Sequence, residues 1–170
     1  MPRKLRVQYA GVIYHLMNRG DRREDIFEDD KDRHRFLETL GQTCDQTGWQ
    51  VHAYCLMSNH FHLVVETPQP NLVAGMKWFL GTYTGRFNRR HQEFGHVFSG
   101  RYKSLIVDGS GSGYLKSVCD YVHLNPVRAG LSRRSRHSQG ENLLPVPPSF
   151  PDGRLTQRLS ARNENRPPEQ

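Results

Sequence analysis

The stretch WQVHAYCLMSNHFHLVVETP, residues 49–68, contains two apolar runs, 49–58 and 60–68, with almost nothing between them. Both runs are rich in apolar and β-branched residues, and prolines follow at the end of the second. Runs of this composition that end at prolines are typical of strands, and their closeness in sequence favours a tight connection. We therefore expect two antiparallel strands joined as a hairpin.

The second run carries two histidines one residue apart. Side chains of a strand alternate between the two faces of a sheet, so Phe61, Leu63 and Val65 are expected to point into a helix-covered core. His60 and His62 then share the opposite, open face, roughly 7 Å apart by strand rise. Imidazoles so spaced can converge on one cation, with a third ligand from elsewhere. An ordinary pair of surface histidines gives the same pattern.

The segments on either side of the hairpin are predicted to form further strands and helices, in an order that is known from other folds. The predicted elements are a strand at 12–20, a helix at 30–47 ended by Gly48, the hairpin, a helix at 71–91, a strand at 101–109 and a helix from 114 that meets Pro126. The first six match the split βαβ pattern. The sequence thus predicts an α+β fold, a ferredoxin-like or RRM-like antiparallel sheet with helices on one face, plus a C-terminal tyrosine-bearing helix.

The character of the chain changes near residue 132. Residues 1–131 are expected to form one domain, with a flexible glycine–serine hinge at 109–113. Residues 132–170 are rich in Arg, Ser, Pro and Asn and poor in apolar side chains, which predicts a basic, largely disordered tail. Docking of residues 143–150 as an extended segment is the alternative.

Composition favours a cytoplasmic protein without a membrane span. No apolar run approaches the roughly 18–20 residues that a span needs, and the N-terminus lacks the apolar core of a signal peptide. The three cysteines, Cys44, Cys55 and Cys119, form no CxxC pair, so they are expected to be small core residues rather than zinc ligands or disulfides.

The net charge of +7 and the pI of about 9.6 favour a phosphate-bearing partner such as DNA, although a merely basic surface is the alternative. The guanidinium fork of arginine suits phosphate well. The candidate phosphate contacts are Arg86, Arg89 and Arg90 at the end of the long helix, Arg101 and Lys103 at the last strand, and Arg3, Lys4 and Arg6 on an N-terminal arm. Tyr83, Phe87, Tyr102 and Trp78 offer aromatic surface for bases, but most are expected in the core.

The last helix brings a tyrosine and an amide to one side. At 100° per residue, Tyr114, Tyr121 and Asn125 fall within an arc of roughly 40°, at the edge of the apolar stripe. Tyr121 and Asn125 are one turn apart and can face the sheet. A tyrosine at the core edge explains Tyr121 equally, and because Asn125 precedes a proline it is also a candidate for ending the helix or capping a short turn.

These motifs carry a resemblance that the histidine pair alone does not. SNHFHLVVE resembles the His-hydrophobic-His motif of the HUH endonuclease superfamily, and YLKSVCDYVHLNPVRAGL resembles the tyrosine helix of its single-tyrosine transposases. Together with YHLMNRG, FNRRH and GHVFSGRYKS, in this order, they are most similar to REP-associated tyrosine transposases and IS200-like insertion-sequence transposases. The resemblance covers about residues 7–131.

The resemblance implies a metal-dependent nickase and strand transferase that acts on hairpin-forming single-stranded DNA through a 5′-phosphotyrosine intermediate. It implies Tyr121 as nucleophile, with Tyr114 as the second choice, and His60 and His62 as ligands of Mg²⁺ or Mn²⁺. A polar side chain one turn after the tyrosine completes the metal site in relatives, which maps to Asn125. Relatives are monomers or homodimers, and both states fit this chain.

Two other functions stay open. The first is a catalytically silent, hairpin-binding module, favoured by the unusual tail and by the lack of an obvious general base. The second is a metal-dependent phosphodiester hydrolase in which the histidines activate water. A silent module forms no cleavage product, whereas a hydrolase cleaves without a covalent adduct and does not need Tyr121.

Overall fold

The computed structural model describes residue 6, residues 8–107 and residues 113–128, without the side chains of 114, 123 and 125–128. Its elements are β1 (Val12–Arg19), the 3₁₀ turn η1 (Asp21–Arg23), α1 (Asp30–Thr47), β2 (Gln50–Met57), β3 (His60–Thr67), α2 (Leu72–His91), β4 (Lys103–Val107) and α3 (Tyr114–Arg128). The strands form one sheet in the order β2-β3-β1-β4, with every neighbouring pair antiparallel. This is the predicted α+β, ferredoxin-like arrangement.

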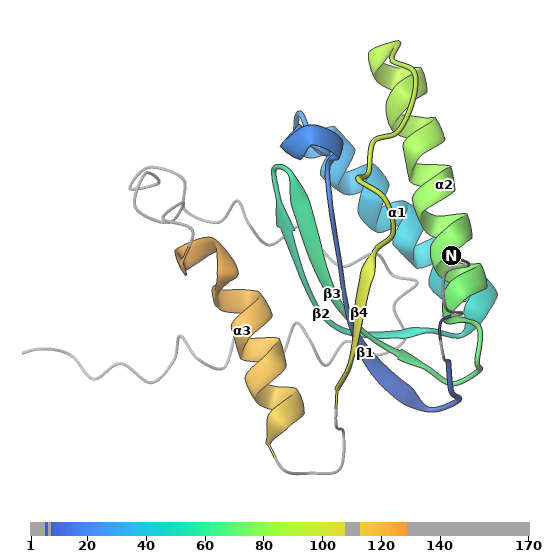
Figure 1. The fold of residues 1–170 in the computed structure, drawn as a ribbon, viewed down its shortest axis with the longest axis vertical. Coiled ribbons are helices and arrows are strands. Elements are labelled where there is room, and N and C mark those ends of the chain that lie inside the picture. The colour runs from blue at the N-terminus through green and yellow to red at the C-terminus, as the bar shows by residue number, and fades with distance from the viewer. Residues whose placement is uncertain (1–5, 7, 108–112, 129–170) are drawn as a thin grey trace, which may run out of the picture.

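The sheet is covered on both faces (Figure 1). Helices α1 and α2 pack on one face, and α3 packs on the other, where the sequence had predicted an open surface. The apolar stripe of α3, with Val122 fully buried, packs against side chains of the sheet. Those side chains are Ile13, Ala53, Cys55, Met57, Val64 and Val107. The histidines of β3 therefore lie in the layer between sheet and α3.

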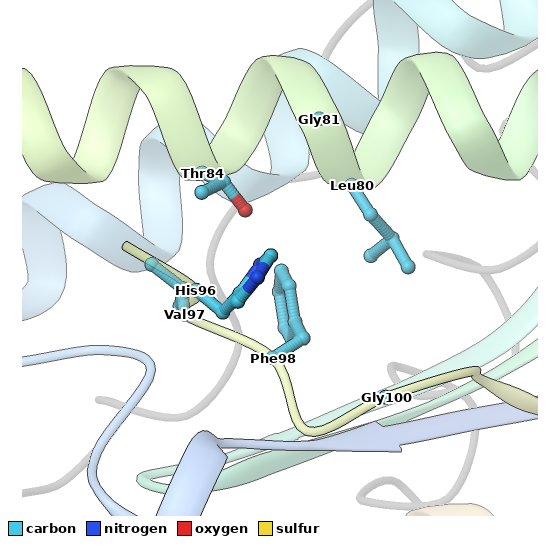
Figure 2. A pocket seen from close by; sticks show the side chains of 7 residues that line it. All are labelled: Leu80, Gly81, Thr84, His96, Val97, Phe98 and Gly100. Carbon is cyan, nitrogen blue, oxygen red and sulfur yellow. The ribbon is translucent and has the colours of Figure 1, made fainter. Parts of the chain in front are cut away.

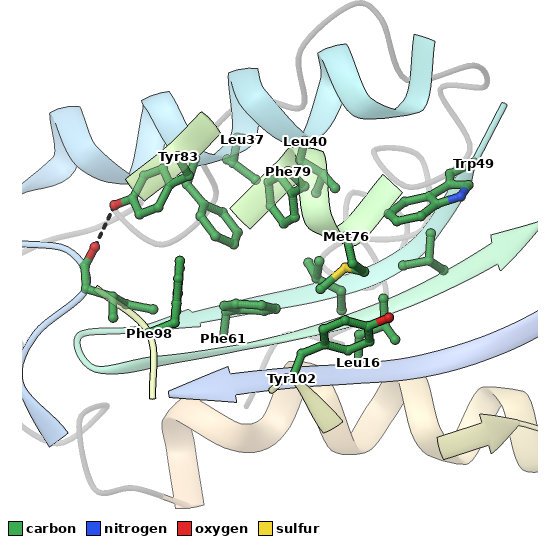
Figure 3. Packing of buried hydrophobic residues seen from close by; sticks show 14 of the residues in the cluster. Leu16, Leu37, Leu40, Trp49, Phe61, Met76, Phe79, Tyr83, Phe98 and Tyr102 are labelled. Carbon is green, nitrogen blue, oxygen red and sulfur yellow. Dashed lines mark hydrogen bonds between the residues drawn. The ribbon is translucent and has the colours of Figure 1, made fainter. Parts of the chain in front are cut away.

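The core between the sheet and the first two helices is aromatic (Figure 3). Phe36 of α1 packs its ring edge-to-face or tilted against Phe61 and Phe79, with centroids 5.0 and 4.8 Å away. The Tyr83 hydroxyl donates a hydrogen bond of 2.5 Å to the Ile26 carbonyl, so this buried polar group is satisfied. This packed aromatic layer lies behind β3, on the face opposite the histidines.

A cluster of charges joins the start of α1 to the end of α2. Asp29 caps α1 by accepting from the Asp32 N–H at 3.1 Å, and its carboxylate is bonded by Arg90. Arg90 also bonds the buried carboxylate of Asp32, which accepts from His91 at 2.9 Å as well. The guanidinium of Arg90 holds the pKa of Asp29 well below its usual range.

Asp29→Asn is expected to lower the melting temperature at neutral pH, because asparagine still caps the helix but carries no charge for Arg90. Since the folded-state pKa of Asp29 is depressed, the charge contributes its stability above its unfolded pKa of 3.8 and loses it as pH falls. The difference from wild type should shrink below about pH 4 in thermal melts. Asp30→Asn is the control, since Asp30 pairs with Arg33 on the surface; an equal effect of both variants would contradict the account.

Two helix ends test the sequence-based boundaries. Gly48 ends α1 in the left-handed conformation, φ 74°, as predicted. Helix α3 continues past Asn125 through Pro126 to Arg128, so the alternative in which Asn125 ends the helix or caps a new turn was wrong. Proline removes one N–H donor but its φ suits a helix, and the loss here falls within the last turn. The tail at 132–170 and most of the 109–113 hinge lie outside the described residues.

The cysteines behave as expected for small apolar residues. Cys44 and Cys55 are buried, Cys119 is half-buried, and all three are free thiols. Burial raises the pKa of the Cys44 thiol to about 12 and that of Cys55 to about 11, so neither is a reactive thiolate at neutral pH. In the part of the chain that the structure covers, no helix combines the length and apolar character needed to cross a bilayer.

Candidate active site

His60 and His62 lie side by side on the α3 face of β3. Their ring centroids are 5.3 Å apart, and the planes are nearly perpendicular at 79°. In the sheet, His60 is paired with Arg19 of β1, and His62 lies between Met17 of β1 and Cys55 of β2. The alternation of the strand thus puts both imidazoles on one face, while Phe61 between them is fully buried in the opposite core.

The residue before the pair orients the first histidine. Nδ1 of His60 lies 2.7 Å from the side-chain oxygen of Asn59. The amide nitrogen of Asn59 donates to the Arg23 carbonyl at 3.3 Å, which fixes the direction of the amide. Because the Asn59 oxygen can only accept, Nδ1 of His60 carries the proton. Nε2 of His60 therefore presents a lone pair.

A third histidine, which the sequence analysis did not single out, orients the second. Nε2 of His15 in β1 lies 3.0 Å from Nδ1 of His62, and both rings are buried. A proton on His62 Nδ1, donated to His15, leaves Nε2 of His62 as a lone pair in the same way. His15 became visible only through the antiparallel pairing of β1 with β3, since nothing in VIYHLMNRG marks its partner.

Burial keeps these imidazoles neutral. Desolvation, assisted by His15, His60 and Arg19, lowers the pKa of His62 to about 4. Desolvation and then the charge of Arg19 lower the pKa of His60, and desolvation alone lowers that of His15. Neutral imidazole is the form that can bind a metal ion, and the lowered pKa values favour that form of both β3 histidines at neutral pH.

Tyr121 of α3 reaches the histidines from the other layer. Its ring centroid lies 6.4 Å from that of His15 and 6.5 Å from that of His62, edge-on to both. The side chain is 43% exposed, so a substrate can reach it. Tyr114 and Asn125 belong to α3 as well, but their side chains lie outside the described part of the chain.

Two cations share the face of the histidines. Arg19 is exposed beside His60, and its charge acts on both β3 histidines. Lys103 of β4 is paired with Met17, which is paired in turn with His62, so the three side chains lie in one row across the sheet. The sequence analysis had named Lys103 and missed Arg19, which only the strand register brings next to His60.

The other predicted phosphate contacts fall into three groups: exposed side chains, side chains bonded within the protein, and residues outside the described part of the chain. Arg89 and Arg101 are exposed. Arg86 donates to Thr39 and Gln42 of α1, and Arg90 belongs to the charge cluster with Asp29 and Asp32. Arg6 lies over the Tyr102 ring at 3.9 Å and bonds Ser104, whereas Arg3 and Lys4 lie outside the described residues.

Most of the predicted aromatic residues are core, as expected. Tyr83, Phe87 and Tyr102 are buried, and Trp78 is half-buried. Phe94, which was not singled out, is 98% exposed in the loop after α2.

The described side chains do not by themselves complete a metal site. Among them, no group of three or more His, Cys, Asp and Glu residues is arranged to hold a metal ion. A third ligand for a metal on the two imidazoles of β3 would therefore come from outside this set, for example from a side chain that the structure does not describe, a phosphate oxygen or water.

Comparison with known proteins assigns the chain to a family. The family model "Transposase IS200 like" matches residues 8–125, a range that includes β1, the histidine pair and Tyr121. No curated protein matches the chain by sequence.

Nine chains of solved structures match the fold. One, a REP-associated tyrosine transposase bound to a REP hairpin, is 13% identical with a TM-score of 0.60, over 76% of this chain and 75% of that one. Another, from Deinococcus radiodurans R1 and described as a candidate transposase, is 19% identical with a TM-score of 0.49, over 72% of this chain and 96% of that one. The family match over more than half of its length shows that this chain belongs to the IS200-like transposases.

Proposed function

We propose that this transposase nicks and rejoins single-stranded, hairpin-forming DNA by covalent catalysis, with Tyr121 as the nucleophile and His60 and His62 as ligands of Mg²⁺ or Mn²⁺. The observation that carries the proposal is the approach of the Tyr121 ring to His62 across the sheet–α3 interface, at 6.5 Å between centroids. A family relative of similar fold has been solved with a REP hairpin, which supports the choice of DNA.

The donor set fits a divalent metal ion. Both β3 histidines are neutral, and each has Nδ1 engaged by a neighbour, so that both Nε2 atoms are left to coordinate. We assign the third position to the side chain of Asn125, one turn after Tyr121 on α3. A bound Mg²⁺ or Mn²⁺ would supply positive charge that polarises the scissile phosphate.

The proposed reaction begins with attack of Tyr121 on the scissile phosphate. The Tyr121 oxygen attacks phosphorus, the new Oη–P bond forms, and the bond from phosphorus to the 3′ oxygen breaks. The phenol proton is lost to solvent and the departing oxygen gains one, giving a free 3′-OH and a 5′-phosphotyrosine. Because the ester conserves the bond energy, attack of a 3′-OH on it rejoins strands without ATP.

The cations around the site hold the DNA backbone. Arg19 and Lys103 share the face of the histidines and are exposed, so they are placed to bind phosphates next to the scissile bond. Arg89 and Arg101 are exposed and serve contacts further along the strand. The partners of Arg86 and Arg90 within the protein favour a structural role for these two side chains.

A denaturing gel separates this function from the two alternatives. Wild-type protein is incubated with labelled hairpin DNA from repeats that flank its gene, with Mn²⁺, with Mg²⁺ or with chelator. A slow, protein-linked DNA band that requires metal is the expected result. DNA binding without any product would instead support a silent binding module. Cleavage without a linked band would support a hydrolase.

His15→Ala is expected to weaken Mn²⁺ binding about 10- to 100-fold, because His62 loses the partner that fixes its tautomer and ring orientation. Binding is measured directly by Mn²⁺ electron paramagnetic resonance. His15→Gln keeps an acceptor for His62 Nδ1 and should restore most of the affinity. His52→Ala is the matched control, since His52 bonds Glu66 at 3.1 Å elsewhere on the sheet. Unchanged Mn²⁺ affinity in folded His15→Ala would contradict the role assigned to His15.

A further inference from the structure

A second candidate binding site lies on the opposite side of the sheet, between α2 and the loop that leads to β4 (Figure 2). The pocket has a volume of about 260 Å³. Its lining residues are Leu80, Gly81, Thr84, His96, Val97, Phe98 and Gly100. Figure 2 shows the rings of His96 and Phe98 rising from the loop toward α2, below the Thr84 hydroxyl and beside Leu80. Apolar walls with an imidazole and a hydroxyl suit a flat heterocycle.

Gly81 lines the pocket on the α2 side. Gly75 of α2 is explained by Trp49, because a Cβ there would come within 2.3 Å of the indole. A Cβ on Gly81 would meet nothing within 4 Å, so the core does not require glycine at this position. A larger side chain at this position would therefore fill pocket space without disturbing the core.

The walls of the pocket are held in place before any ligand binds. The Asn88 side chain donates to the Gly95 carbonyl at 3.0 Å and closes the turn after α2. Further on, Phe98 forms a bridge with Gly20, and the Ser99 N–H donates to the Arg19 carbonyl at 2.8 Å. The loop is therefore fastened to the end of β1, which keeps the ordering cost of binding low.

The same fastening connects the pocket to the candidate active site. Arg19 is paired with His60 on one side and with Ser99 on the other. Two strand spacings, about 10 Å, thus separate the backbone of His60 from that of Ser99, which lies between the lining residues Phe98 and Gly100. A strand that joins the two sites has to pass around the edge of the sheet, so at a rise of about 3.4 Å per nucleotide it spans at least about three nucleotides.

The charges around the pocket match a DNA strand. Lys77 is exposed one turn before Gly81 on the same side of α2, and Arg101 is exposed next to Gly100. A strand that runs from the scissile phosphate around the β4 edge passes Arg19 and Arg101 on its way to the pocket. Single-stranded DNA contacts of this kind combine cations for phosphates with an aromatic surface for one base.

We propose that this pocket binds one unpaired base of the substrate strand, a few nucleotides from the scissile phosphate, and so sets where the strand is cut. The inference rests on the proposed nicking of single-stranded DNA. The exposed imidazole of His96 stacks on the base above an apolar floor that includes the buried ring of Phe98, and the Thr84 hydroxyl lies where it can bond the edge of the base.

The test first removes single bases from the DNA and then fills the pocket with a larger side chain. Affinity is measured by fluorescence anisotropy in Tyr121→Phe protein, which leaves the DNA intact, with hairpin DNA from the flanking repeats. Single abasic sites are placed at each nucleotide near the cleavage point. One position should weaken binding about 5- to 30-fold. Adding Gly81→Leu should weaken binding of intact DNA by a similar factor and abolish the extra loss at that abasic position.

Gly85→Leu is the matched control, because Gly85 lies in the same helix, also has open space around it, and does not line the pocket. It should retain the position-specific loss, and both leucine variants should melt no lower than the parent. Absence of a sensitive position, or a loss that persists in Gly81→Leu, would overturn the pocket assignment. The linked-DNA band of wild type reports separately on the proposed function, so a band without a sensitive position rejects only the pocket.

Discussion

Tyr121→Phe is expected to reduce formation of protein-linked DNA by at least about 10⁴-fold, to below detection on a denaturing gel. The variant lacks the hydroxyl oxygen, which is the only atom of this side chain that can bond to phosphorus. Without that atom the covalent intermediate cannot form at this residue. Since Tyr121 is 43% exposed and contacts the histidines by its ring edge, loss of the hydroxyl should leave the fold intact. DNA binding by anisotropy should therefore change less than threefold or so.

The matched control is Tyr114→Phe, which makes the same change at the first residue of α3. It should form the linked product at the wild-type rate. If Tyr114→Phe abolishes the product while Tyr121→Phe does not, the covalent mechanism stands and the nucleophile has been misassigned. Persistence of the product in both variants would reject a tyrosine of α3 altogether.

Loss of a β3 histidine should have the next largest effect. His60→Ala is expected to slow metal-supported nicking about 10²- to 10³-fold and to raise the Mn²⁺ concentration required for half-maximal rate, because one of two imidazole ligands is removed. His60 is the cleaner choice, since it is only half-buried. His62 is buried and holds His15, so its loss also leaves a polar group without its partner.

The control for this experiment is His34→Ala, in which an exposed histidine of α1 is removed. Nicking rates are measured over a Mn²⁺ titration for wild type and both variants. Excess Mn²⁺ should partly rescue His60→Ala and have no differential effect on His34→Ala. A His60→Ala variant with wild-type rate and metal dependence would show that this imidazole is not a ligand.

The fold was predictable because its signals are local. The apolar spacing of residues 30–47 and the glycine after them gave α1 and its end, and the alternation in 60–68 gave the face of each β3 side chain. What the sequence did not show depends on which strands become neighbours. His15 and Arg19 join the site only because β1 pairs with β3, a contact between residues more than 40 positions apart.

The positions of the basic residues in the sequence did not show which of them are available to bind DNA. The run that contains Arg86, Arg89 and Arg90 looks uniformly basic in sequence, but helix geometry and the partners on α1 separate its members. Arg90 meets two carboxylates at the start of α1 and Arg86 meets polar groups, whereas Arg89 points outward. A count of cations thus predicts a partner class, while the contacts decide which cation is available to it.

The most direct test of the account is to find the atom that carries the DNA. Wild-type protein is incubated with hairpin DNA and Mn²⁺, treated with nuclease and trypsin, and the peptides are analysed by mass spectrometry. Trypsin separates the two tyrosines of α3, because Tyr114 falls in the fragment 104–116 and Tyr121 in the fragment 117–128. The account predicts a nucleotide attached through phosphate to Tyr121 in fragment 117–128. A nucleotide on any other residue, or cleaved DNA with no modified peptide, would contradict it.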